Sequence, residues 1–318
     1  MLSEEEFKLG RLCVVGNINR DIKTAAFAGG ERILRDGETP VGSITETVGG
    51  GGANSAFAAA ALGARVAFHG KVGADPLGER LERTLLRHGV AAHLARDPRH
   101  PTGNSIALTY ADGHRHFLSC QPNNESLAPE DLDPRAFAGF KHLFRADIWF
   151  SKTMLFGGNA RLFQAARDLG MTISIDLNWD PQWGVASAAE VQTRKQAVRE
   201  VLRWVQVAHG NMRELNEFAD APTLETSLAR LEEWGVEAVV VHMGSAGAGY
   251  YRRGQFTVEP AATAKRRVNA TGTGDVLSVC MMLLDAHPDP SAKLKLANTI
   301  VAEFIEGRRQ LIPVLDPA

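Results

Sequence analysis

Short hydrophobic runs alternate with amphipathic segments along most of this chain. Residues 12–15 (LCVV) are apolar and are followed at once by Gly16, which is typical of a buried strand in a parallel sheet. Similar β-prone runs recur, with helix-like segments between them. The runs are 66–69, 143–150, 172–176, 205–208 and 238–242, and the helical segments are 53–62, 77–88, 159–169, 188–204 and 224–234. This alternation predicts an α/β fold of three α/β/α layers, in which helices cover both faces of a mainly parallel sheet.

Two stretches interrupt this alternation. Residues 22–48 have no helical period and are rich in Gly and Thr. Residues 103–119 alternate apolar and polar positions around Ala111-Asp112-Gly113, and Asp-Gly between β-prone runs predicts a hairpin. We expect both stretches to form antiparallel strands outside the main sheet, as a small β lid over its edge. Two further helices are expected at 275–286 and 291–305, and no linker divides the chain, so residues 1–318 should form one domain.

Composition and charge restrict the possible functions. The chain has 318 residues, 44% hydrophobic and 23% charged, with a net charge of −2. These values are ordinary for a soluble globular protein and argue against nucleic acid or an anionic membrane as partner. The first residues, MLSEEEFKLGRL, are unlike a secretory signal, and the longest apolar stretch, 56–64, is too short to span a bilayer. Three widely spaced cysteines favour reduced thiols, so a cytoplasmic location is expected.

The strongest local motif is Asn269-Ala-Thr-Gly-Thr-Gly-Asp275, which leads directly into an apolar helix. Glycines before a helix allow backbone N–H groups to converge on an anion, and the helix dipole adds positive potential there. Such a cradle stabilises the charge of a phosphoryl group during transfer, and a carboxylate beside it can accept the proton of an attacking hydroxyl. Asp275 is therefore a candidate base. A plain glycine loop capped by Asp would have the same pattern.

Two other motifs carry polar side chains next to glycines. Gly49-Gly-Gly-Gly-Ala-Asn54 opens a helix of small residues, where a ligand can approach the backbone and Asn54 can pair with hydroxyls. Gly16-Asn-Ile-Asn19-Arg-Asp21 follows the first strand, and ligands of open α/β sheets bind beyond the carboxyl ends of strands. Asn19 and Asp21 would point the same way in an extended segment. Each motif alone could also be a surface turn. Neither is a Walker A or dinucleotide-binding motif.

Taken together and in this order, the three motifs resemble those of the ribokinase-like (PfkB) carbohydrate kinase family. Three further segments resemble family elements in the expected places. They are Gly70–Gly78 (GKVGADPLG), Asn211-Met-Arg-Glu214 and Gly244-Ser-Ala-Gly247. The resemblance spans residues 11–313, almost the whole chain, and it implies a three-layer α/β/α fold with a small β lid.

The resemblance also implies an activity, namely transfer of the γ-phosphoryl group of ATP to a hydroxyl of a small sugar-like molecule. Asp275 would be the base, and Gly272, Thr273 and Gly274 would form the anion hole. The residues implied to contact the sugar are Asn19, Asp21, Gly49, Gly50 and Asn54. Those implied to contact ATP are Asn211, Glu214, Gly244, Gly247 and Asn298, with Glu214 holding Mg²⁺ through water.

The sequence departs from the family pattern at two places. The family signature usually begins Asp-Thr, and that Asp often helps to hold a monovalent cation, whereas this chain has Asn269-Ala270. We therefore expect little dependence on K⁺. Asp180 stands where the family often has an Arg near an acidic substrate, which favours a neutral sugar. Lys152 falls near the expected substrate pocket; if it faces the ligand, a sugar acid becomes a candidate again.

Two alternatives remain open from the sequence. One is a nucleoside kinase of the same family, with the sugar site opened to accept a base. The other is a non-catalytic relative that binds a sugar without consuming ATP, although the retained Asp275 and Glu214 argue against it. An exposed lid sheet could also pair with its twin, so a homodimer through the lid is a possible assembly.

Overall fold

The computed structural model describes residues 2–30, 33, 35–112, 114–266, 268 and 271–315. Within these ranges, nine strands form one large sheet in the order β13-β12-β11-β10-β9-β8-β1-β4-β5. Pairing is parallel from β11 through to β5, whereas β12 runs antiparallel to both of its neighbours. The bounds are β13 Gln255–Glu259, β12 Ala248–Arg252, β11 Ala238–His242, β10 Val207–Asn211, β9 Thr172–Asp176, β8 His142–Arg145, β1 Arg11–Val15, β4 Arg65–Gly73 and β5 Val90–Asp97.

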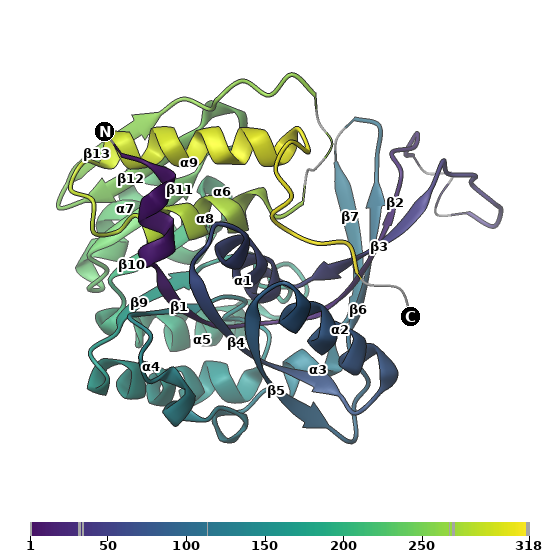
Figure 1. The fold of residues 1–318 in the computed structure, drawn as a ribbon, viewed down its shortest axis with the longest axis horizontal. Coiled ribbons are helices and arrows are strands. Elements are labelled where there is room, and N and C mark those ends of the chain that lie inside the picture. The colour runs from purple at the N-terminus through teal and green to yellow at the C-terminus, as the bar shows by residue number, and fades with distance from the viewer. Residues whose placement is uncertain are drawn as a thin grey trace.

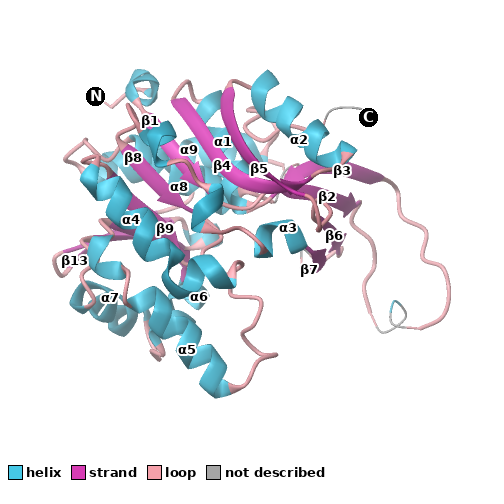
Figure 2. Ribbon diagram, turned by 90° about the horizontal axis from the view of Figure 1, so that it is seen from below, coloured by secondary structure: helices cyan, strands magenta, loops and turns pink. Residues whose placement is uncertain are grey.

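Helices cover both faces of this sheet (Figure 2). Successive residues of a strand point to opposite faces, and β1 shows this clearly. Leu12 and Val14 belong to one hydrophobic cluster, and Cys13 and Val15 to another. The first cluster includes helices α1 (Gly51–Ala61), α2 (Pro76–Arg87), α8 (Thr273–Leu283) and α9 (Pro290–Ile305). The second includes α4 (Asn159–Asp168), α5 (Ala188–Arg199), α6 (Met212–Ala219) and α7 (Leu224–Glu233). The expected three layers are confirmed.

A second, four-stranded sheet stands beside the large one (Figure 1). Its order among the described residues is β3 (Ile44–Gly49), β2 (Asn19–Thr24), β6 (Asn104–Thr109) and β7 (Arg115–Cys120). Most of it comes from the stretches 22–48 and 103–119, so the expected lid strands are present. The β6–β7 pair is antiparallel as expected, but β2 and β6 pair in parallel. We call this sheet the lid.

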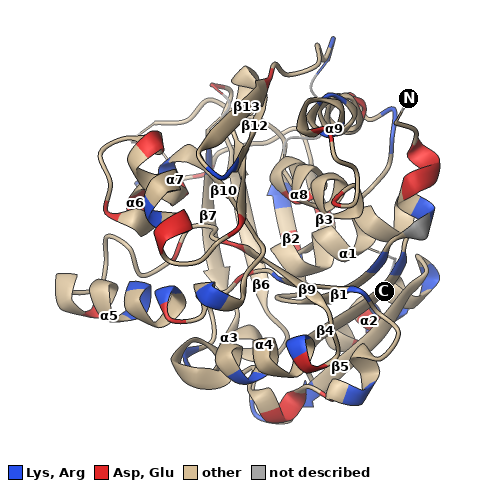
Figure 3. Cartoon of the chain, turned by 90° about the vertical axis from the view of Figure 1, so that its left-hand side faces the viewer, with Lys and Arg blue, Asp and Glu red and all other residues tan. Residues whose placement is uncertain are grey.

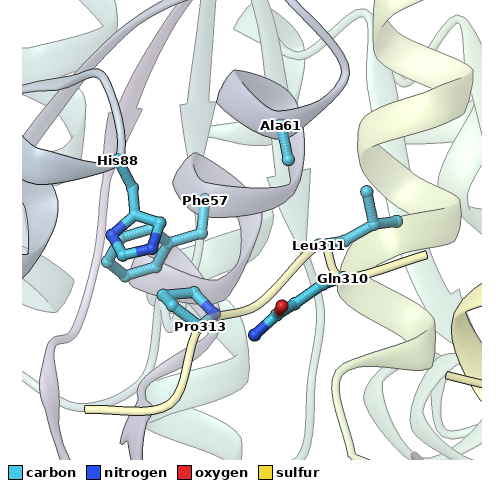
Figure 4. A pocket seen from close by; sticks show the side chains of 6 residues that line it. All are labelled: Phe57, Ala61, His88, Gln310, Leu311 and Pro313. Atoms are coloured by element: carbon cyan, nitrogen blue, oxygen red, sulfur yellow. The ribbon is translucent and has the colours of Figure 1, made fainter. Parts of the chain in front are cut away.

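The C-terminal segment packs back onto the start of the chain. It passes α1, where Leu311 and Pro313 line a small cavity of about 180 Å³ together with Phe57 and His88 (Figure 4). Further on, Val314 forms a β-bridge with Thr47 of β3. Residues 311–315 therefore join the helical layer to the edge of the lid.

Several predicted boundaries were wrong. The strand expected at 143–150 ends at Arg145, because Asp147 has a φ of 53°, which an extended strand cannot contain. The strand expected at 205–208 is β10, which begins at Val207 and continues to Asn211. Strands β5, β12 and β13 and helices α6 and α3 (Pro122–Glu125) were not predicted.

Candidate active site

The candidate site lies where β1, β8 and β9 end and where helices α1 and α8 begin. Gly272 directly precedes helix α8 and has a φ of +83°, a conformation that glycine adopts without steric cost. Among the described residues, no side chain caps this helix, so the first backbone N–H groups remain available to an anion. Thr273 and Gly274 line a large cavity beside it. Gly272, Thr273 and Gly274, the predicted anion hole, therefore lie together at the start of α8, and their role in binding an anion stays a prediction.

Asp275 lies in the first turn of α8 and contacts the other glycine-led helix. Its Oδ2 accepts a hydrogen bond of 2.9 Å from Nδ2 of Asn54 in α1. Burial raises the pKa of Asp275 to about 7, with further increases from the carboxylates of Asp147 and Glu214 and a decrease from the Asn54 hydrogen bond. A carboxyl group with such a pKa can gain or lose a proton near neutral pH, which suits a general base.

Helix α1 begins differently, because a carboxylate of the protein occupies its N-terminus. Asp147 accepts hydrogen bonds from the backbone nitrogens of Asn17 (2.9 Å), Gly52 (2.8 Å) and Gly51 (3.3 Å). Gly50, with a φ of +96°, allows the turn before the helix, since a Cβ there would lie 2.3 Å from the carbonyl oxygen of Asn17. Sequence reasoning missed Asp147. The available signal was a carboxylate directly after a buried strand of a parallel sheet.

Asn19 and Asp21 lie side by side on β2, as predicted for an extended segment. Asn19 Nδ2 donates to Asp21 Oδ1 over 2.7 Å, and both side chains are buried. Gly49 on the neighbouring strand leaves room for them, because a Cβ there would lie 2.0 Å from Asp21 Oδ1. The Oδ1 atoms of Asn19 and Asn54 are buried without a hydrogen-bond partner in the described part of the chain. Buried acceptors of this kind are suited to hydroxyl donors of a ligand.

A cavity of about 810 Å³ opens on the other side of the α8 N-terminus. Its lining includes Asn211, Gly244, Gly247 and Asn298, four of the predicted nucleotide contacts. Two of them also shape the wall. Asn298 Nδ2 donates to the carbonyls of Glu259 and Pro260, and a Cβ at Gly247 would lie 2.1 Å from the Glu259 carbonyl. The cavity is large enough for a ligand of nucleotide size.

His242 also lines this cavity and was not predicted. Its Nε2 lies 3.0 Å from Ser278 Oγ, and a Cβ at Gly274 would lie 3.1 Å from its Nδ1. The imidazole therefore lies directly against the start of α8. Burial lowers the pKa of His242 to about 4, so the ring is neutral at neutral pH. Its position at the end of β11, one residue before Met243-Gly244, was the available signal.

Asn211 and Glu214 form a capping box at the start of α6. Asn211 Oδ1 accepts from the backbone nitrogen of Glu214 over 2.9 Å, and Glu214 Oε2 accepts from that of Asn211 over 2.8 Å. Burial raises the pKa of Asp176 well above its usual range, and the carboxylates of Glu214 and Asp275 raise it further. This acidic surrounding is suited to a divalent cation. No three Asp, Glu, His or Cys side chains of the described residues are placed to hold a metal by themselves.

Lys152 lines a separate pocket of about 270 Å³ together with Asp180, Arg194 and Gln121. Asp180 is buried and forms an ion pair with Arg194, whose Nε lies 2.6 Å from Asp180 Oδ2. The negative charge of Asp180 is therefore balanced within the protein. Gln121 accepts hydrogen bonds from Asn17 and Asn124, so this pocket adjoins the loop that follows β1.

Asn269 and Ala270, on which the K⁺ expectation rests, lie outside the described residues. Elsewhere on the molecule, Lys and Arg are interspersed with Asp and Glu along the helices (Figure 3). Within the described residues, no helix is both long and apolar enough to cross a membrane.

The family of this chain follows from comparison with known proteins. A profile described as "pfkB family carbohydrate kinase" matches residues 10–300. The chain belongs to the pfkB family of carbohydrate kinases. This kinase is 24% identical to a ribokinase of Arabidopsis thaliana over 282 residues, which are 84% of this chain and 68% of that protein. It is 28% identical to a fructokinase of Klebsiella pneumoniae over 303 residues, which are 89% of this chain and 94% of that one.

Solved structures support the same fold. A protein from E. coli named ribokinase II, in complex with ATP and Mg²⁺, superposes with a TM-score of 0.77 at 20% identity, covering 93% of each chain. The expected ribokinase-like architecture of this kinase is thereby confirmed, including the large mainly parallel sheet and the small lid.

Proposed function

We propose that this kinase transfers the γ-phosphoryl group of ATP to a hydroxyl of a small sugar or sugar-like molecule, with Asp275 as the base. The observation that carries the proposal is the hydrogen bond between Asn54 and Asp275. The two residues are 221 positions apart, and their bond joins the first turns of α1 and α8 at one carboxylate. Thr273 and Gly274, directly before this carboxylate, line the large cavity, and Asn54, which donates to it, carries one of the two buried acceptors without a partner among the described residues.

In this proposal the acceptor sugar binds under the lid, to Asn19, Asp21, Asn54 and the backbone of Gly49 and Gly50. Asp275 takes the proton of the attacking hydroxyl, whose oxygen then forms a bond to the γ-phosphorus. The bond from that phosphorus to the bridging oxygen breaks, and its electron pair leaves with ADP. The N–H groups at Gly272, Thr273 and Gly274 stabilise the charge on the phosphoryl oxygens.

The nucleotide would lie in the 810 Å³ cavity, along Gly244, Gly247 and Asn298. Mg²⁺ would neutralise part of the phosphate charge, and Glu214 would hold it through water, with Asn211 beside the phosphates. The raised pKa values of Asp176, Glu214 and Asp275 support a cation at this place, because each reflects a carboxyl group that burial and neighbouring charge make difficult to ionise.

An acidic sugar is the second candidate acceptor, and Lys152 is the observation that favours it. Lys152 lines the 270 Å³ pocket and has no ion-pair partner in the described residues, whereas Asp180 is already paired with Arg194. Lys152 would then bind the acid group of the acceptor. If the acceptor is neutral, Lys152→Met should leave its KM unchanged.

The proposal is tested by ADP release from purified protein with MgATP, across hexoses, pentoses, sugar acids and nucleosides. We expect at least one sugar to raise ADP release well above the rate with ATP alone. A nucleoside as the sole active acceptor would favour a nucleoside kinase. Sugar binding detected by thermal shift, with no ADP release for any acceptor, would contradict phosphotransfer.

We also expect little dependence on K⁺, because Asn269-Ala270 lacks the usual carboxylate. Exchange of K⁺ for Na⁺ or choline in the same assay should leave the rate nearly unchanged. Activity that requires K⁺ would contradict this expectation.

A further inference from the structure

The charges around Asp275 are mostly negative. Asp21, Asp147 and Glu214 each raise the pKa of Asp275, so three further carboxyl groups lie close enough to influence it. The phosphates of ATP would add more negative charge at this place. Like charges at short range in a partly buried site repel strongly, so phosphoryl transfer here requires positive charge near the moving group.

In the main body of the protein, Lys265 and Arg266 line the large cavity, and two more cations, Arg145 and Arg213, act on the carboxylates themselves. Arg145, the cation that acts on Asp147, is buried beneath it and donates to the carbonyls of Val15 and Ala146 and to Asn159. Arg213, which acts on Glu214, lies over the ring of Trp179, 4.0 Å from its centroid. Both cations are therefore engaged with the protein.

The lid supplies two further cations from its inner face. Lys23 follows Asp21 by two positions on β2, so both side chains point to the same side of the sheet. Arg115 of β7 donates a hydrogen bond to Thr271 Oγ1, in the loop that leads directly into Gly272. This contact joins the lid to the start of α8, beside the anion hole.

The ammonium group of Lys23 is largely buried but lacks close hydrogen-bond acceptors among the described residues. Its side chain is only 21% exposed, and its Nζ lies 3.8 Å from Asp21 Oδ2, beyond hydrogen-bond distance. No other acceptor reaches it in the part of the chain that the structure describes. Burial and the charge of Arg115 lower the pKa of Lys23, while the charges of Asp21 and Asp275 raise it. A buried ammonium with unused donors, close to the proposed base, is suited to a ligand that brings negative oxygens.

We infer that Lys23 is a phosphoryl-contacting residue of this kinase, delivered by the lid. This inference rests on the proposed function. With the acceptor and MgATP bound, the Lys23 ammonium donates to an equatorial oxygen of the phosphoryl group as the bond to the acceptor oxygen forms and the bond to ADP breaks. Arg115 is a positioning residue, because its contact with Thr271 holds the lid against the anion-hole loop.

The test compares Lys23→Met, Lys23→Gln and Lys23→Arg with the wild type, using the best acceptor from the ADP-release panel. Removal of one preorganised donor to transition-state charge lowers kcat by about 100-fold or more, so we expect a loss of that order for Met and Gln, with KM for ATP within about threefold. Lys23→Arg should restore at least part of the rate, because it keeps the charge. Arg20→Met is the matched control, since Arg20 lies on the outer face of the same strand and pairs with Glu46; its kcat should stay near wild type.

A second readout separates a contact with the phosphoryl group from a structural role. Thermal shift is measured with MgADP, and with MgADP plus aluminium fluoride as a mimic of the transferring group. The Lys23→Met variant should keep the rise in unfolding temperature that MgADP causes. It should lose most of the additional rise that aluminium fluoride causes in the wild type. A kcat within threefold of wild type, or an equal loss in Arg20→Met, would overturn the role of Lys23 alone. If the wild type transfers phosphate to no acceptor, the proposed function is overturned, and the fluoride shift still decides whether Lys23 contacts the mimic.

Discussion

Helices α1 and α8 both begin with a glycine at positive φ and pack against each other, yet their N-termini differ in what they hold. The first backbone N–H groups of α1 donate to the carboxylate of Asp147, which is part of the protein. The N-terminus of α8 has no side-chain cap among the described residues and opens into the nucleotide-sized cavity. Both helices follow glycine-rich segments, but their first N–H groups have different partners.

This difference shows why a glycine-led helix start is weak evidence for an anion site when read alone. The same backbone N–H groups can bind a ligand or an internal carboxylate, and only the tertiary structure decides between them. At α1 the amides fix Asp147 and leave Asn54 to face the cleft. At α8 no side chain of the described residues occupies them.

The largest expected effect comes from removing the proton acceptor at α8. Asp275→Asn keeps the size of the side chain but cannot take a proton, so we expect kcat to fall by about 1,000-fold, within the usual contribution of a general base. The KM values should change little. Steady-state kinetics measure both, and an unchanged thermal unfolding midpoint serves as the control. Near-wild-type kcat would remove Asp275 from its proposed role.

Removal of the Asp147 carboxylate at the start of α1 should lower the stability of the fold. Asp147→Ala leaves buried N–H groups of residues 17, 51 and 52 without their acceptor, which costs roughly 1–3 kcal/mol. Asp147→Asn retains an acceptor oxygen and should cost less. Denaturant unfolding of both variants checks this, and equal stability of Asp147→Ala and wild type would show that the amides find other partners.

Alanine in place of the glycine before α1 and of the glycine before α8 should have different effects on stability and on kcat. Both need positive φ, but a Cβ at Gly50 meets the backbone carbonyl of Asn17, whereas a Cβ at Gly272 meets the end of the flexible Ile312 side chain. Gly50→Ala should therefore lower stability by roughly 2 kcal/mol and Gly272→Ala by about 1 kcal/mol. Gly272→Ala should lower kcat more, since it disturbs the anion hole. Gly89→Ala, at a φ of +77° with open space around it, measures the strain from φ alone. The reverse order of stability would contradict this account.

The smallest effect concerns the pH dependence of the rate. The base must be ionised, and the pKa of Asp275 is raised to about 7, so kcat/KM should rise with pH and level off above that value. The Asn54 hydrogen bond lowers this pKa, so Asn54→Ala should move the midpoint of the rise to higher pH. A profile that is flat between pH 6 and 8 would indicate that another group limits the rate.

The hydrophobic pattern was sufficient to predict the layered sheet, because buried parallel strands appear as short apolar runs between helices. The runs 12–15, 172–176 and 238–242 match β1, β9 and β11 almost residue for residue. The edge strands β5 and β13 have several exposed residues and weaker patterns, and β12, although mostly buried, is only five residues long and contains a glycine, so all three were missed. Helix α6 was missed because it is short and its start was interpreted as an Asn-x-x-Glu ligand motif.

For the site, the sequence predicted the residues that glycines mark, such as Gly272 to Asp275 and Gly49 to Asn54. It did not predict Asp147, Lys23 or His242, because their local signals are weak: Asp147 follows an apolar run, His242 ends one, and Lys23 lies just beyond the motif that ends at Asp21. The position of such a residue depends on which strands become neighbours. Asp147 reaches the site because β8 pairs with β1, and Lys23 because β2 pairs with β3 in the lid. Such adjacency is a property of the topology and not of any single segment.

The C-terminal segment has a consequence for how copies of this protein could assemble. Val314 pairs with Thr47 on the side of β3 that faces away from β2, and the Leu315 nitrogen lies 3.4 Å from the Glu46 carbonyl. The border of the lid at β3 is therefore occupied by the chain itself around Glu46 and Thr47. All six residues of β7, at the opposite border, are exposed. A second subunit that extended the lid by strand addition would have to join along β7.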